Sequence, residues 1–222
     1  MSGATLGALQ QSGFHLYAFR PVTSSNKSGV PLVWQRLDSY LQTTPLSFVS
    51  EALSAYISTD NISIDGTITV GASEAVSLGQ IVSVDTNGNL TAADGAPTGD
   101  VYIASGANTN FTCGLAAPPA GMLEQPFCAF TLYPQVAVTM QPADAIFVMW
   151  ATSTYDPAVY MQQSLGPGLL VGFGDATART VSYDIELGWQ AESAIWAQPV
   201  MPGSNLVATL IFDPGPNHPT YR

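Results

Sequence analysis

The chain has 222 residues, of which 46% are hydrophobic and only 9% are charged, and 16 acidic against 5 basic side chains give a formal net charge of −11. Binding to nucleic acid or anionic lipid requires clustered cations, and the basic residues here are scattered, which excludes both partners. No segment approaches the roughly 20 apolar residues of a membrane helix, and the N-terminus lacks the features of a signal peptide. We therefore expect a compact acidic protein that is cytoplasmic, non-classically secreted or part of a particle.

Short segments with the two-residue period of strands begin near the N-terminus. In the segment 14–22, Leu16 and Ala18 fall on one face and Tyr17 on the other. A second strand is expected in 29–34.

A single helix is predicted after residue 44. The Thr44 hydroxyl can cap it by accepting a backbone N–H, and Pro45 suits a first helical turn. Apolar residues then recur at intervals of four, from Phe48 to Tyr56, which is typical of one helix face. The alternative is a strand through 46–49.

From residue 61 onward the pattern is that of a meander. The pair Asp65-Gly66 predicts a turn between two apolar alternations, and Asn87-Gly88 supplies the left-handed residues that a tight hairpin requires. Further strands are predicted at 101–103, 127–133, 136–140, 146–151, 169–173, 180–187 and 206–212.

Many short strands with Gly and Pro turns, and no recurrent helices, predict an all-β fold. We expect an antiparallel β-sandwich, a jelly roll or similar, with at most one or two short helices. Residues 1–212 should form a single domain. A sub-division near 116–121 is the alternative, because that stretch is rich in Pro, Gly and Ala. The Pro-rich tail 213–222 cannot pair in a ladder and should be extended.

The sequence offers no convincing catalytic constellation, so we expect a protein that is not an enzyme and that uses no cofactor or metal. His15 is the one histidine in an ordered pattern, and a strand histidine is far more often structural than a general base. Asp184 and Glu186 are two residues apart in a predicted strand, a spacing that would suit a glycosidase pair. A solvated sheet face is the better explanation of these two carboxylates. A carboxylate-dependent hydrolase is therefore only the third functional hypothesis.

The chain contains two cysteines, Cys113 and Cys128. A disulfide between them would close a short Pro-rich loop. The alternative is a pair of buried free thiols, because cysteine packs as a small hydrophobic side chain.

Aromatic residues gather between residues 150 and 196, and this segment provides the candidate binding site. Exposed rings beside Asp, Asn or Gln stack on sugars or on choline groups, and amphipathic rings also locate at membrane surfaces. The expected ligand is therefore a glycan or a neutral lipid headgroup. The alternative is that tryptophans in a β domain belong to its core. The candidate ligand-binding residues are Tyr155, Asp156, Tyr160, Trp189 and Trp196.

Two segments resemble known families. Residues 66–105 resemble phage capsid-decoration proteins through the hairpin sequence GQIVSVDTNGNL at 79–90, which implies a role in virion structure. The loop at Tyr155-Asp156 resembles the aromatic lipid-binding loop of actinoporin-like cytolysins, although the chain lacks the amphipathic N-terminal helix and the many basic residues of that family. No residue role is carried over from either.

The leading functional hypothesis is a non-enzymatic binding protein, lectin-like or cytolysin-like, that recognises a glycan or a membrane headgroup. The second is a self-assembling structural protein, such as a virion or filament component. Low charge and a surface rich in Ser and Thr suit dense subunit packing, so self-association is expected under this second hypothesis.

Overall fold

The structure is a computed structural model that describes residues 1–26, 28–47, 52–192 and 195–213. Strands make up 44% of the chain, which confirms the predicted all-β, sandwich-like class. The described part contains two short helices, α1 (Gly3–Gln11) and α2 (Leu206–Leu210). Among the described residues, no helix combines the length and the apolar character that crossing a membrane demands.

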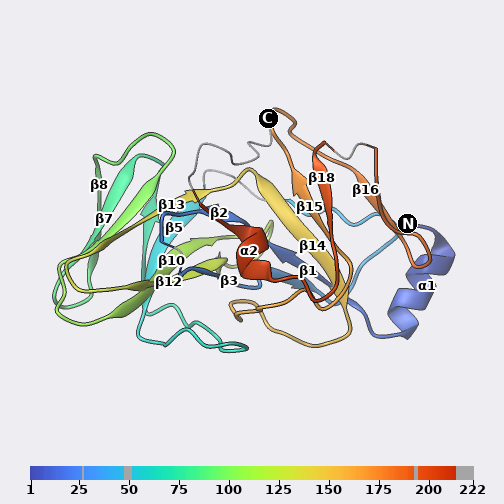
Figure 1. Cartoon of the computed structure of the whole chain (residues 1–222), viewed down its shortest axis with the longest axis horizontal. Coiled ribbons are helices and arrows are strands. Elements are labelled where there is room, and N and C mark those ends of the chain that lie inside the picture. The colour runs from blue at the N-terminus through green and yellow to red at the C-terminus, as the bar shows by residue number, and fades with distance from the viewer. Residues whose placement is uncertain (27, 48–51, 193–194, 214–222) are drawn as a thin grey trace.

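Three sheets follow one another along the long axis of the molecule (Figure 1). The first sheet, on the right in this view, is antiparallel throughout and has the order β18 (Ala197–Val200), β15 (Gly168–Gly172), β14 (Ala145–Ala151), β1 (His15–Phe19) and β4 (Gln35–Leu37). The central sheet has the order β3 (Val30–Pro31), β12 (Cys128–Leu132), β10 (Phe111–Ala117), β5 (Leu53–Ser58) and β6 (Ala72–Val76), with β11 (Gln125–Pro126) beside β10.

The third sheet extends to the left end of the molecule (Figure 1). Its order is β19 (Ile211–Phe212), β2 (Val22–Thr23), β13 (Ala137–Pro142), β9 (Val101–Ser105), β7 (Gln80–Val84) and β8 (Leu90–Asp94). Two of its pairs, β19 with β2 and β7 with β9, are parallel. A separate hairpin of β16 (Val181–Asp184) and β17 (Gly188–Ala191) lies at the other end of the molecule, near α1.

The first sheet is buried on both faces, and its strands alternate as predicted. Leu16 and Val148 belong to a core cluster that also takes residues from the other two sheets. Tyr17 and Phe147 point to the opposite face, where Leu206 of α2 covers them. Because successive side chains of a strand point to opposite faces, the alternation in the sequence separates these two sides before any tertiary contact is known.

The helix predicted after residue 44 is wrong. Residues 44–47 have no regular structure, and Tyr56 lies in β5; positions 48–51 are outside the described residues. Tyr56 is paired with Gly114 of β10 on one side and with Ser73 of β6 on the other. These long-range pairs supply the backbone hydrogen bonds of the segment. They favour a strand although the local spacing of apolar residues also suits a helix.

The strand predicted at 206–212 is also only partly right, because α2 occupies its first five residues. The side chain of Asn205 caps this helix by accepting the backbone N–H groups of Val207 and Ala208 at 2.8 and 3.3 Å. A similar cap starts α1, which the sequence reading missed. There the Ser2 hydroxyl accepts the N–H of Thr5 at 3.1 Å, as expected of a helix N-cap.

The two predicted turns have different outcomes. Asn87-Gly88 does join a hairpin, β7 to β8, but only Gly88 has a positive φ, 80°. The Asp85 carboxylate holds the loop by accepting the N–H of Asn87 at 2.7 Å. At Asp65-Gly66 the chain turns without forming a hairpin, because the next residue bridges to position 159 instead.

The disulfide between Cys113 and Cys128 is absent, and both thiols are free and buried. In the ladder of β10 and β12, Cys113 is opposite Phe130 rather than Cys128. Burial raises the pKa of both thiols, that of Cys128 to about 12, so neither forms a thiolate readily. The alternative interpretation, two small hydrophobic core residues, is the one that the structure supports.

Candidate functional site

The structure separates the five predicted ligand-binding residues. Tyr160 is only 7% exposed and packs in the core beside Leu32 and Ile68. Tyr155 is half-buried against the α2-covered face of the first sheet. Burial raises the pKa of the Tyr155 hydroxyl, and the nearby Asp65 carboxylate raises it further. The buried Tyr160 ring therefore offers no open face of the kind that stacking on a sugar requires.

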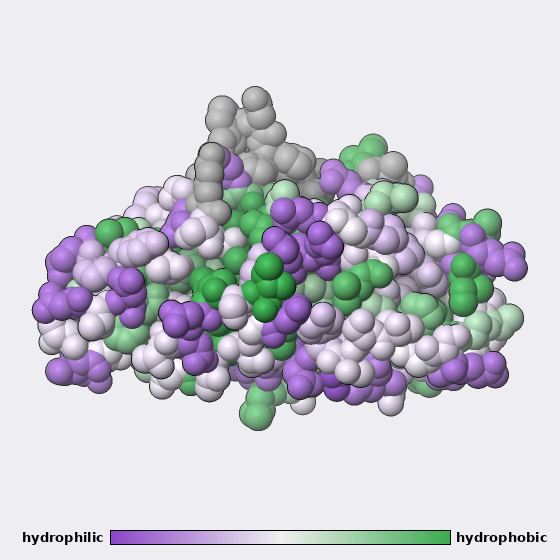
Figure 2. Space-filling model, turned by 60° about the horizontal axis from the view of Figure 1, so that its bottom comes forward, coloured by the Kyte–Doolittle hydropathy of each residue, from purple (hydrophilic) through white to green (hydrophobic). Residues whose placement is uncertain are grey.

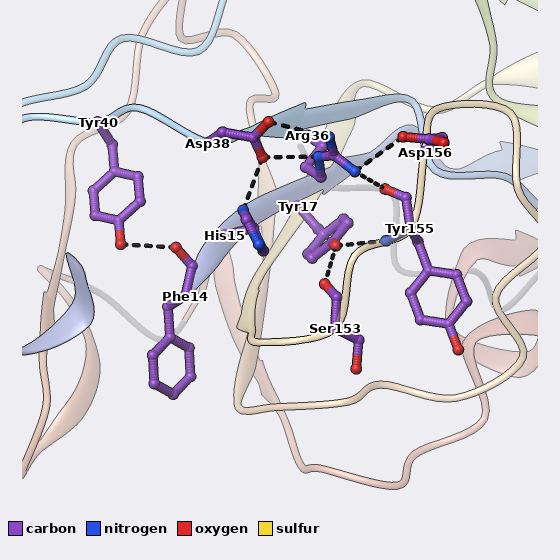
Figure 3. A network of polar contacts seen from close by, with 9 residues as sticks. All are labelled: Phe14, His15, Tyr17, Arg36, Asp38, Tyr40, Ser153, Tyr155 and Asp156. Atoms are coloured by element: carbon purple, nitrogen blue, oxygen red, sulfur yellow. Dashed lines mark hydrogen bonds and ion pairs between the residues drawn. The ribbon is translucent and has the colours of Figure 1, made fainter. Parts of the chain in front are cut away.

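Asp156 belongs to a surface network that fixes the loop before it (Figure 3). Arg36 donates to the Asp156 carboxylate at 3.0 Å and to the Tyr155 carbonyl at 3.2 Å. The hydroxyl of Tyr17 donates to the carbonyl of Ser153 and accepts the N–H of Tyr155 at 2.9 Å. The network therefore anchors this loop to β1 and β4.

The same network holds His15, whose Nδ1 lies 2.8 Å from a carboxylate oxygen of Asp38. Partial burial would raise the pKa of Asp38, but the hydrogen bond and charge of Arg36, together with His15, hold it below its ordinary value. A histidine and an aspartate in contact are two parts of a catalytic triad. The nearby Ser153 does not complete it, because its side chain points away from His15 (Figure 3).

Trp189 lies at a different place, a cavity of about 810 Å³ on the Leu16–Val148 face of the first sheet. We call it the hairpin cavity, because β16 and β17 form one of its walls. The segments 42–47 and 173–180 enclose it from the other sides. Its aliphatic floor comes from three neighbouring strands and consists of Leu16, Ile146, Val148 and Val171.

An aromatic cluster forms one end of the hairpin cavity. The rings of Trp150 and Trp189 are nearly parallel, with centroids 6.3 Å apart, and Tyr183 contacts Trp189 edge-on at 5.1 Å. Trp189 is fixed further because its Nε1 donates to the carbonyl of Pro167 at 2.9 Å. The Nε1 of Trp150 is buried and has no hydrogen-bond partner within the described part of the chain, an arrangement that native structures rarely leave unexplained.

The rim of the hairpin cavity is polar and mostly uncharged. Its hydroxyl and amide side chains are Gln42, Thr43, Thr44, Ser47, Thr177, Thr180 and Ser182. The charged groups are Asp144, Asp175 and Arg179. Burial raises the pKa of Asp144, although the Arg20 guanidinium opposes that shift.

Trp196 is connected to this rim but does not line the cavity. The guanidinium of Arg179 lies 4.9 Å from the centre of its ring and donates to the carbonyl of Phe173 at 3.0 Å. Of the five predicted residues, Trp189 lines the hairpin cavity and Trp196 contacts its rim through Arg179, whereas Tyr155, Asp156 and Tyr160 lie elsewhere. Trp150 lies in the predicted aromatic segment but is not among the five candidates. Its position on the same strand face as Ile146 and Val148 is the sequence feature that could have identified it.

The carboxylates of Asp184 and Glu186 are not on one strand face. β16 ends at Asp184, so the shared face that the spacing predicts is absent. The Asp184 carboxylate accepts the backbone N–H groups of Glu186 and Leu187 and the hydroxyl of Thr5. These bonds lower its pKa and hold the turn between β16 and β17.

The hairpin cavity is thus an apolar slot with an aromatic end and a polar rim, suited to binding. The described residues contain no group of three or more His, Cys, Asp or Glu side chains placed to hold a metal ion. Over the face in Figure 2, hydrophobic and hydrophilic residues are interspersed. Comparisons with protein-family models, curated proteins and solved structures found no match.

Proposed function

We propose that this chain is a non-enzymatic glycan-binding protein whose site is the hairpin cavity. The observation that carries the proposal is the half-buried Trp189 ring, which stands at a cavity whose rim consists mainly of hydroxyl and amide groups. A sugar ring presents an apolar face of C–H groups and an edge of hydroxyls. The Trp189 ring at the aromatic end can stack on the C–H face, and the polar rim can form hydrogen bonds with the hydroxyls.

The site is pre-organised for such a ligand. Trp189 is held by its bond to Pro167 and by its contact with Trp150, so binding immobilises few side chains and loses little entropy. Asp144 and Asp175 provide acceptors for sugar hydroxyls.

A choline headgroup fits the same site less well. Recognition of a quaternary ammonium requires aromatic faces that are open to the cation. Trp150 and Tyr183 are only 1% and 8% exposed, and their faces are occupied by each other and by Trp189. These features favour a glycan over a choline lipid.

The test is a glycan array followed by titration calorimetry on the best binder. We expect Trp189→Ala to weaken binding by about 1–3 kcal/mol while the protein stays folded, on the scale of an aromatic contact. Tyr133→Ala is the control, because Tyr133 is an exposed aromatic residue, 52% accessible, in the turn between β12 and β13. It should bind as the wild type does.

Two results would refute the proposal: no glycan retained on the array, or wild-type affinity in folded Trp189→Ala. Light scattering of the native protein accompanies the test. A large, homogeneous particle that binds no glycan would favour the second hypothesis, a self-assembling structural protein.

A further inference from the structure

We infer that the hairpin cavity also takes an apolar group joined to the sugar, so that the ligand class is a glycoside with a linear aliphatic aglycone rather than a free saccharide. The inference rests on the proposed glycan function and specifies its substrate class. The aliphatic floor of the cavity carries the inference, because a sugar at the rim would leave it empty.

A free saccharide cannot occupy the floor favourably. Leu16, Val148 and Val171 carry no polar side-chain atom, and they form the floor together with Ile146. A sugar has a hydroxyl on nearly every carbon, and a hydroxyl buried without a hydrogen-bond partner costs free energy. The sugar should therefore stay at the polar rim, which leaves the floor to a group that needs no hydrogen bonds.

The cavity has further apolar lining residues outside the floor. Leu46, Phe173 and Val181 line it and are partly buried against the same core cluster. An aliphatic chain in contact with these residues and with the floor would be shielded from water. Transfer of its methylene groups out of water would then contribute favourably to the free energy of binding.

The dimensions of the cavity suit a chain more than a second sugar ring. Ile146, Val148 and Trp150 form a row on one face of β14, and four residues of strand extend over about 13 Å. This length is comparable to an extended octyl chain. A volume of about 810 Å³ falls within the usual range of small-molecule sites.

Trp150 lies at the junction of the two parts. It ends the aliphatic row on β14 and stacks on Trp189 at the sugar end. The change from sugar to aglycone should therefore fall beside this ring.

The experiment compares alkyl chains on the same sugars, using the wild-type protein. The probes are n-octyl and methyl β-D-glucopyranoside, β-D-galactopyranoside and β-D-mannopyranoside, titrated below the micelle concentration of the octyl forms. Each methylene buried contributes about fourfold in affinity. We therefore expect at least one octyl glycoside to bind more than about tenfold tighter than its methyl counterpart.

A pair of variants locates the chain. Val148→Thr keeps the side-chain shape but adds a hydroxyl to the floor, and it should reduce the octyl-to-methyl affinity ratio about fivefold. Val84→Thr makes the same change at a buried valine of β7 that does not line the cavity, and it should leave the ratio unchanged. Thermal melting of both variants establishes that each is folded.

The failures of this inference and of the proposed function are distinguishable. Equal affinities for octyl and methyl glycosides would overturn the aliphatic aglycone and leave glycan binding intact. An unchanged ratio in folded Val148→Thr would also overturn it. Binding of n-octylphosphocholine without binding of any glycoside would overturn the sugar part, and with it the ligand class inferred here.

Discussion

The replacement Gly114→Ala tests the packing of the central sheet most directly. Gly114 lies in the middle of β10, where the ring of Tyr56 crosses the strand. The Tyr56 hydroxyl donates to the carbonyl of Cys128 at 2.8 Å, directly above this glycine. A Cβ at position 114 would lie 2.0 Å from that carbonyl oxygen and 2.7 Å from the Tyr56 ring.

Both contacts are too short for any alanine, so the ring and the neighbouring strand must move. Overpacking of this kind costs about 1–3 kcal/mol. Moving the ring also breaks the bond from Tyr56 to Cys128, and a buried hydroxyl left without a partner costs about 1–3 kcal/mol more. Alanine restricts the unfolded chain more than glycine does, which recovers somewhat under 1 kcal/mol. We expect a net loss of about 2–5 kcal/mol.

Urea unfolding followed by tryptophan fluorescence measures this change in the free energy of unfolding. Gly7→Ala is the matched control, because Gly7 lies in α1 with nothing within 4 Å of an added Cβ. That variant should gain about 0.5–1 kcal/mol, since alanine favours a helix over glycine. A Gly114→Ala protein within about 1 kcal/mol of the wild type would refute this account of the packing.

Three further predictions follow from single side chains. Hydrogen bonds hold the folded pKa of Asp184 below its unfolded value. Its contribution to stability is therefore complete above about pH 4 and is lost as the pH falls through the folded pKa. Below about pH 4 the melting temperature of Asp184→Asn should depend less steeply on pH than that of the wild type, and an equal slope would contradict this. In the folded protein neither Cys113 nor Cys128 should react with a chromogenic disulfide reagent at pH 8, because burial raises the pKa of both thiols. Both should react once the protein is denatured. An unreactive denatured sample would indicate a disulfide bridge. Trp34→Phe should lose more stability than Trp150→Phe, because the Trp34 indole N–H donates to a backbone carbonyl at 2.9 Å and its loss leaves that buried carbonyl unpaired. The Trp150 N–H has no partner among the described residues, so the same change there breaks no such bond. Equal losses in urea unfolding would argue against this difference.

The candidate site was only partly predictable from the sequence. The concentration of aromatic residues between positions 150 and 196 predicts a binding segment, and Trp189 of that segment lines the hairpin cavity. Tyr160 also lies near a polar turn, yet it is buried in the core. A polar turn nearby does not determine whether a ring faces solvent, because exposure depends on which distant strand packs over it.

The sequence by itself determined the fold class and, in β1, which side chains share a face. Alternation there assigned Leu16 and Tyr17 to opposite faces, because side-chain direction has a period of two residues in any strand. The Ser2 cap of α1 is an equally local feature of the sequence.

Only the tertiary structure decided what covers each face. The Tyr17 side of the first sheet is closed by α2, whereas the Leu16 side meets the β16–β17 hairpin across the hairpin cavity. The tertiary structure likewise placed Tyr56 in a strand rather than a helix. The physical reason is the same in both cases: a residue's own segment fixes the direction of its side chain, but the contacts that bury it come from segments far away in the chain.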